Sequence, residues 1–427
     1  MRFAVLLAAA AMARGQGRDP GAVLEQARPR LRAAARGLDN YVCIETLDRN
    51  YYGRVAAGAA PAACAETGAG GPRQLEFTDR ARLEVTVSQG RELHSWPGAT
   101  RFDSRDVDEL IRDGPVSTGA FGAYLASVFD QPAAAFQYNG ERTANGRAVF
   151  EYGYRVALEA SRFEIKVGAA WLPAAYEGEV RIDPQSLDLE RMTIRISQLP
   201  PGAAFCQAGA TLDYQRVRIG ASDVLLPRQS QLEILLDGGR ETRNAIAFSN
   251  CREYRAESEI VFDAPAGPES AVPPRAGRGR VALPIGLPVT LALGAPIDTA
   301  AAAAGDPVAA RVVKPVRRPG SREELIPAGA VVHGRIRRVE HHLLPTPYFL
   351  IAISFNRVEI QGILSSFEAR SEPPAELARE LGANLAMRQT GVWSWGVGTF
   401  LFPSGKSRIE IQAGFESNWF TLAAGGR

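Results

Sequence analysis

Cysteine and histidine are scarce in this chain of 427 residues, which contains four of each. No two cysteines form a C-x-x-C pair, and the motifs H-E-x-x-H, G-x-S-x-G, G-x-x-x-x-G-K-[ST] and G-x-G-x-x-G are missing. These absences argue against a zinc site, a nucleophile-elbow hydrolase, a P-loop nucleotidase and a dinucleotide-dependent enzyme. The sequence therefore predicts a protein that is not an enzyme and that holds neither a cofactor nor a metal.

Concentrated charge and long apolar runs are missing too. The net charge is +2, and arginines are interleaved with acidic residues instead of forming a basic patch, which predicts no nucleic-acid partner. The apolar run at residues 3–13 is shorter than the roughly 18 to 20 residues that cross a bilayer. Arg2 before the run and small residues after it are typical of a secretory signal peptide. We therefore expect a signal peptide at residues 1–17 and a mature chain that is periplasmic or secreted and not transmembrane.

The even number of cysteines suits an oxidising compartment and predicts two disulfides. Three pairings are possible. Joining Cys43 to Cys64 and Cys206 to Cys251 closes two modest loops between segments that read as neighbouring strands. The sequence favours this pairing.

The length predicts two domains, each large enough for its own core. Residues 264–280 are rich in proline, glycine and alanine and show no periodicity, which is typical of a linker. The first domain is then residues 18–263 and the second is residues 281–427.

Periodicity predicts a mainly β protein with a few helices, of the α+β class. Residues 21–40 have an apolar stripe of helical spacing, Leu24, Leu31, Ala35 and Leu38, weakened in the middle by Pro29. Alternating apolar and polar residues then predict half-buried antiparallel strands. Strands are expected at 82–87, 149–158 and 189–196, hairpins around 183–184 and 237–239, and short helices at 103–114 and 118–130.

The second domain reads as a small β-barrel or sandwich. Its short strands come at intervals typical of such folds, and one helix, residues 374–387, interrupts them. The strands are expected at 287–293, 306–316, 330–340, 348–360 and 364–371.

The segment 324–342, "ELIPAGAVVHGRIRRVEHH", could be a binding or catalytic loop or a corner between strands. His341 and His342 are adjacent, so on a strand they point to opposite faces and cannot readily share one ion, whereas Glu340 and His342 could share a face. We favour an exposed strand end that binds no metal.

Two other clusters invite a functional reading. His94 and Ser95 lie beside Trp96, but no nucleophile on a constrained turn completes a hydrolytic triad. A group of acids lacks the glycine and terminal glutamate of a calcium loop and reads as a helix start. These acids are Asp103, Asp106, Asp108 and Glu109.

The aromatic segment 391–405 is either a buried hairpin of the second domain or an exposed patch for a partner or a membrane. Trp393 and Trp395 share one strand face, and Phe400 and Phe402 share another single face, as strand packing requires. Burial is the favoured interpretation.

Residues 22–263 resemble the LolA-like family, which includes periplasmic lipoprotein carriers and RseB-type sensors of envelope stress. The resemblance rests on an N-terminal helix, a long antiparallel series of strands with two short helices after the first few, and acidic turns leading into strands, as in "IDPQSLDLERMTIRI". It implies a half-barrel sheet that wraps around helices and holds lipid in its concave face.

Residues 308–362 are similar to the barrel domain of TrbI-like proteins of conjugation and type IV secretion. The similarity lies in "VAARVVKPV", "LIPAGAVVHGRI" and "FLIAISFNRVEIQG". It implies a strand, a tight turn and a second strand, in which Pro327 fixes the backbone while Gly329 and Gly334 relieve crowding. The helix at 375–386 is too short for that family's membrane-crossing insertion, so channel formation is not implied.

Together these features predict an exported, non-enzymatic bacterial cell-envelope protein that binds an apolar ligand, a lipid or lipoprotein, or an envelope partner. The alternative is a structural or assembly subunit that makes only protein contacts. The two hypotheses differ in whether the concave face of the first domain is open and apolar or filled by its own side chains.

Overall fold

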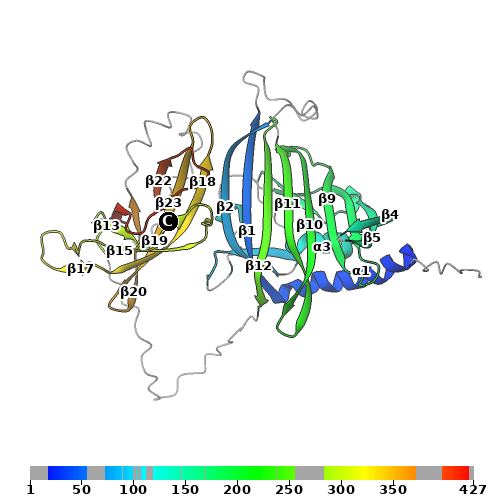
Figure 1. Ribbon diagram of the computed structural model, residues 1–427, viewed down its shortest axis with the longest axis horizontal. Coiled ribbons are helices and arrows are strands. Elements are labelled where there is room, and N and C mark those ends of the chain that lie inside the picture. Colours follow the sequence, from blue (N-terminus) through cyan, green and yellow to red (C-terminus); the bar gives the residue numbers. More distant parts are fainter. Residues whose placement is uncertain are drawn as a thin grey trace, which may run out of the picture.

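The computed structural model describes residues 18–54, 73–254 apart from short gaps, 283–371 and 397–422; the gaps are 89, 100–101, 103–106, 112–118, 145, 169 and 237. The predicted signal peptide, the linker and the helix at 374–387 lie outside these residues. The described chain is mainly antiparallel β with few helices, as predicted (Figure 1). We call residues 18–254 the N-terminal unit and residues 283–422 the C-terminal unit.

Helix α1 (Pro20–Gly37) opens the N-terminal unit. Asp19 caps it, since its carboxylate accepts a hydrogen bond of 2.9 Å from the Ala22 N–H, and Pro20 occupies the first turn, where no donor is needed. The helix runs through Pro29, and its buried stripe begins one residue earlier than predicted. This stripe is Val23, Ala27, Leu31 and Ala35. None of the described helices is long and apolar enough to cross a bilayer.

Ten strands of the N-terminal unit form one antiparallel ladder. In spatial order they are β4 (Ala135–Ala144), β5 (Arg147–Val156), β8 (Ala175–Ile182), β9 (Leu189–Gln198), β10 (Phe205–Ile219), β11 (Ser222–Leu236), β12 (Glu241–Glu253), β1 (Tyr41–Arg54), β2 (Arg73–Ser88) and β3 (Arg91–Ser95). The smaller elements are η1 (Leu38–Asn40), α2 (Val107–Leu110), α3 (Ala123–Phe129), η2 (Leu158–Ala160), β6 (Glu164–Val167) and β7 (Ala170–Pro173).

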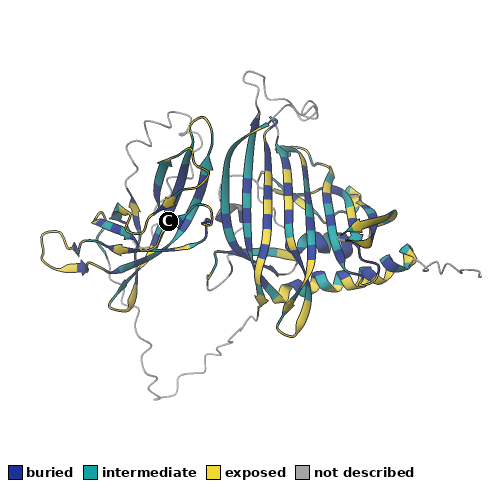
Figure 2. Cartoon of the chain, viewed as in Figure 1, coloured by how far each residue is buried: buried dark blue, intermediate teal, exposed yellow. Residues whose placement is uncertain are grey.

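The two faces of this ladder differ in burial, as the alternating colours of its strands show (Figure 2). One face packs against α1 and α3 in a single apolar cluster, and we call it the helix face. The strand residues predicted to share a buried face lie there: Phe150, Tyr152, Tyr154 and Val156 of β5, and Met192 and Ile194 of β9. The alternate residues lie on the opposite face, which we call the open face.

The C-terminal unit has a second ladder and its own apolar cluster. Its order is β21 (Ala369–Ser371), β24 (Glu416–Thr421), β13 (Pro288–Leu293), β15 (Pro307–Val312), β18 (Val331–His342) and β19 (Tyr348–Ile360), whose far edge pairs with β20 (Ile363–Ser366) and β22 (Gly398–Pro403). Two small pairs are β14 (Ile297–Asp298) with β23 (Glu410–Ile411), and β16 (Val316–Arg317) with β17 (Glu324–Ile326). Among the described strands no pairing closes this ladder, so the small barrel or sandwich stays a prediction.

The two units are joined by a pairing between strands of their two sheets. Nothing in the sequence predicts this pairing. Strand β18 pairs with β2, with Glu340 opposite Asp79 and His342 opposite Phe77, and the two strands lie side by side in Figure 1. Farther along β2, the Arg82 N–H donates to the Ala304 carbonyl at 2.7 Å. We call this contact the junction. The independent folding of the two units stays a prediction.

Candidate functional site

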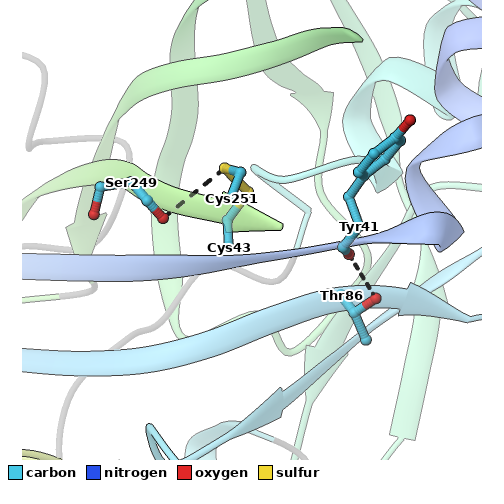
Figure 3. The surroundings of a disulfide bond; sticks show 5 residues. All are labelled: Tyr41, Cys43, Thr86, Ser249 and Cys251. Atoms are coloured by element: carbon cyan, nitrogen blue, oxygen red, sulfur yellow. Dashed lines mark hydrogen bonds between the residues drawn. A yellow bond between two sulfur atoms is a disulfide. The ribbon is translucent and has the colours of Figure 1, made fainter. Parts of the chain in front are cut away.

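The structure corrects the disulfide assignment. Cys43 on β1 is bonded to Cys251 on β12, and these strands are neighbours in the ladder (Figure 3). The predicted pairs, Cys43 with Cys64 and Cys206 with Cys251, are therefore wrong. Cys206 is also disulfide-bonded, and Cys64 lies outside the described residues. The bonded cysteines are 208 residues apart, so only the order of strands in the sheet reveals that they meet.

The segment 324–342 contains a strand, a turn and a second strand. β17 ends at Ile326, Pro327 follows, and Gly329 adopts a φ of 83° before β18 begins. Gly334 lies within β18, where an added Cβ would come 2.0 Å from the Ser354 carbonyl oxygen. β17 pairs with β16 and not with β18, so the turn leads from one strand pair to another. These glycines serve backbone geometry.

The histidines of this segment do not form the exposed strand end that the sequence predicts. The Nε2 atom of His342 lies 2.8 Å from a carboxylate oxygen of buried Glu340, on the same strand face. Its ring stacks on Tyr348 and on Phe77 of the N-terminal unit. Burial raises the pKa of Glu340, but the charge of Arg338 and the His342 hydrogen bond lower it more, to about 2. His342 is therefore part of the junction.

His94 also has a structural setting. It is 2% exposed, and its Nε2 atom lies 3.2 Å from the carboxylate of buried Glu45 on β1. Glu92, on the same strand as His94, accepts hydrogen bonds from the N–H groups of Gly122 and Ala123 at the start of α3. Among the described residues no three histidine, cysteine or acidic side chains are grouped to hold a metal. His94 belongs to a buried polar cluster beneath α3 that sequence reasoning missed.

Burial and charge oppose each other in this cluster. Burial lowers the pKa of His94, but the hydrogen bond and charge of Glu45 and the charge of Glu92 outweigh it, so that the net pKa is raised. Burial raises the pKa of Glu92. The raised pKa of His94 favours its protonated imidazolium form, which does not resemble the neutral base of a hydrolytic triad.

The acidic group at residues 103–109 and the aromatic segment 391–405 lie largely outside the described residues. Asp103, Asp106, Trp393 and Trp395 are not among them, and Asp108 and Glu109 are described only as part of the backbone of α2. Phe400 and Phe402 on β22 are half-buried against the second apolar cluster, and both contact Phe415.

The helix face is the broadest apolar surface of the N-terminal unit. Leu31 of α1 and Tyr124, Leu125, Val128 and Phe129 of α3 fill it, together with the strand residues of the same cluster. Buried tyrosines link the sheet to both helices. The Tyr152 hydroxyl donates to the Pro20 carbonyl at 2.8 Å, and the Tyr176 hydroxyl donates to the Ser127 carbonyl at 2.6 Å. The face is apolar, and in this structure it is filled by the protein's own side chains.

No model of a known protein family matches the chain, and no curated protein matches it either. Solved structures do. A putative outer membrane lipoprotein-sorting protein domain from Vibrio parahaemolyticus is 12% identical over 55% of this chain and 93% of its own, with a TM-score of 0.27. A LolA superfamily protein from Nitrosomonas europaea is 8% identical over 54% and 94%, with a TM-score of 0.25. The lipoprotein LppX of Mycobacterium tuberculosis is 11% identical over 56% and 99%, with a TM-score of 0.20.

The second of these proteins bears the family name that the sequence resemblance of residues 22–263 supplied. The TrbI-like resemblance of the C-terminal unit stays a prediction.

Proposed function

We propose that this chain is an exported, non-enzymatic cell-envelope protein whose N-terminal unit binds a lipid, or the acyl chains of a lipoprotein, on the helix face. The observation that carries the proposal is the composition of that face, a continuous apolar surface spanning the ladder and covered by α1 and α3. A ligand inserted between the ladder and the two helices would contact the apolar side chains of both, so that little apolar area would become exposed to water.

Some of the contacts that hold α1 and α3 on the sheet are weak. Ala27 and Ala35 of α1 present only small side chains to the sheet. At the far end of the cover, Asp130 joins the two helices, because Arg36 and Arg32 of α1 lie 2.9 and 3.2 Å from its carboxylate. These ion pairs are partly exposed, and such pairs contribute about 0 to 1 kcal/mol each. On this proposal, α1 and α3 move away from the sheet when lipid binds.

A lipid-uptake assay tests this proposal. Asp130→Asn removes the link between α1 and α3, so the variant should take up a fluorescent fatty acid faster than the wild type does. Glu323→Gln is the matched control, since it breaks a comparable exposed pair with Arg318 in the C-terminal unit. Equal uptake rates in the wild type and both variants, or no uptake by any of them, would contradict lipid binding on the helix face.

The second candidate function is that of an assembly subunit with protein contacts only. Two observations favour it: the helix face is filled by the protein's own side chains, and a β-strand pairing joins the two units. Native mass spectrometry of the protein purified from its own host separates the two functions. Co-purifying lipid supports the carrier, whereas a stable complex with other protein subunits and no lipid supports the assembly subunit.

A further inference from the structure

The open face of the N-terminal ladder is hollowed into a long trough. Its lining residues come from seven consecutive strands, β4 to β12 in spatial order, and from the start of β2, and the trough encloses about 1260 Å³. Since neighbouring strands lie about 4.8 Å apart, the six steps across these strands span about 29 Å. This volume exceeds the roughly 300 to 1,000 Å³ of ordinary small-molecule pockets. The trough is shaped for an extended occupant.

Short side chains make the floor of the trough. Gly209 on β10 lies between Glu233 and Arg195 in the cross-strand register, and Thr211 lies opposite Thr193.

The charges of the trough cancel. Its lining includes four arginines, Arg73, Arg155, Arg195 and Arg243, and four glutamates, Glu177, Glu179, Glu233 and Glu241. Several of these pair with each other: Arg155 with Glu177 at 3.0 Å, Arg73 with Glu241 at 2.8 Å, Arg195 with Glu177, and Arg243 with Glu241. A surface with no net charge gives no electrostatic advantage to a polyanion such as nucleic acid or to a polycation.

The uncharged lining contains both polar and apolar residues. Four exposed side-chain amides, Gln137, Asn139, Gln207 and Gln231, face the trough, and each offers both donors and acceptors. The aromatic lining residues, Phe136 and Tyr154, pack with the helix-face cluster. The trough can therefore contact an occupant through hydrogen bonds along its length and through apolar lining residues such as Ile194 and Ile234.

We propose that the open-face trough binds an uncharged, linear glycan. Such a polymer is extended, carries hydroxyl groups that donate and accept along its whole length, and needs no counter-charge. Each of these properties matches a property of the trough: its length, its amide lining and its balanced charge. This site is on the opposite side of the sheet from the helix face and does not depend on lipid binding.

Affinity electrophoresis of the full mature chain tests the proposal, with hydroxyethyl cellulose, dextran and glycol chitin as neutral polymers and heparin as a polyanion. We expect retardation by at least one neutral polymer that persists at high salt. The double variant Gln137→Ala/Gln231→Ala should weaken that binding about tenfold or more, because it removes two hydrogen-bonding groups. Gln185→Ala/Gln412→Ala removes two exposed amides outside the trough and should bind as the wild type does.

Circular dichroism and the uptake of the fluorescent fatty acid should be the same in both double variants, so a loss of glycan binding is separable from misfolding and from a failure of the lipid proposal. Retardation by heparin alone, retardation by none of the neutral polymers, or equal retardation of the two double variants would overturn the glycan site.

Discussion

Gly329 and Gly334 are glycines for different physical reasons. Gly329 has a φ of 83°, in the region that side chains disfavour, but no atom lies within 4 Å of the position that a Cβ would take. Gly334 has no such backbone conformation, and its Cβ would instead collide with the Ser354 carbonyl oxygen on β19. Gly329 is therefore required by its backbone conformation, whereas Gly334 is required by the narrow space between β18 and β19.

Alanine substitutions should therefore rank clearly. Gly334→Ala should lower the free energy of unfolding by about 2 to 4 kcal/mol, because backbone atoms of two paired strands must move apart. Gly329→Ala should lower the free energy of unfolding by about 1 kcal/mol, because a side chain disfavours a positive φ. Urea unfolding of both variants measures the difference. The opposite order would mean that the turn, and not the spacing of β18 and β19, limits the stability of this segment.

His94 makes the stability of the N-terminal unit depend on pH. Its pKa is raised in the folded protein above the ordinary value of 6.5. A group with a raised folded pKa contributes stability that is fully present below its unfolded pKa and is lost as the pH rises through its folded pKa. The raised pKa of Glu92 acts in the same direction, starting from a lower pH.

The melting temperature of the wild type should accordingly fall as the pH is raised from about 6 to about 8. His94→Gln should be less stable at the acidic end of this range and should lose most of the slope. His333→Gln, which changes a partly exposed histidine of the C-terminal unit, is the control and should keep the slope. A slope that survives in His94→Gln would assign the pH dependence to other groups.

At the scale of single elements, the sequence predicts the buried face of a strand or helix, because that face follows from the periodicity of apolar residues. The alternation in β5 and β9 identifies the buried face correctly, and the spacing in α1 identifies its stripe to within one residue. It does not predict which strands are neighbours. β1 lies between β2 and β12, and nothing local in "YVCIET" shows that its partner lies near the other end of the unit.

The Cys43–Cys251 disulfide joins β1 to β12, which are the first and the last strands of the N-terminal unit along the chain. Because it closes a very long loop, its removal should cost about 4 kcal/mol or more in the chain-entropy account. Cys43→Ala/Cys251→Ala should show this loss in guanidinium unfolding. Peptide mapping without reduction should recover Cys43 joined to Cys251 and, as the remaining cysteine, Cys64 joined to Cys206. A Cys43–Cys64 peptide would contradict the strand order described here.

At the scale of the whole molecule, neither the open-face trough nor the junction between the two units could be predicted from the sequence. The trough arises because outward-facing residues of seven strands come into register, and each of them alone looks like an ordinary solvent-exposed residue. The junction arises because an edge of β2 stays free along Phe77, Thr78 and Asp79, and β18 of a distant unit occupies it. Both features depend on contacts between segments far apart in the chain.

The junction is extensive for two units connected by a linker. Besides the strand pairing, Arg82 forms an ion pair with Asp306, and the Arg335 guanidinium donates to the Pro97 carbonyl at 3.0 Å. The guanidinium of Arg337 lies 4.8 Å from the ring centre of Trp96. Backbone pairing, charge and aromatic contacts of this kind hold two surfaces together without help from the linker.

The two units should therefore stay associated after the linker is cut. Limited proteolysis should cleave between Asp263 and Arg280, and the two fragments of the wild type should still elute together in gel filtration. Phe77→Ala removes the ring that stacks on His342 at 5.0 Å and on Tyr51 at 4.0 Å, so its fragments should separate at a lower urea concentration than the wild-type fragments do. Phe415→Ala is the control, because Phe415 contacts Phe400 and Phe402 within the C-terminal unit, and its fragments should behave as those of the wild type do. Wild-type fragments that separate on cleavage would show that the linker alone holds the units side by side, and cleavage within residues 140–250 would place the domain boundary elsewhere.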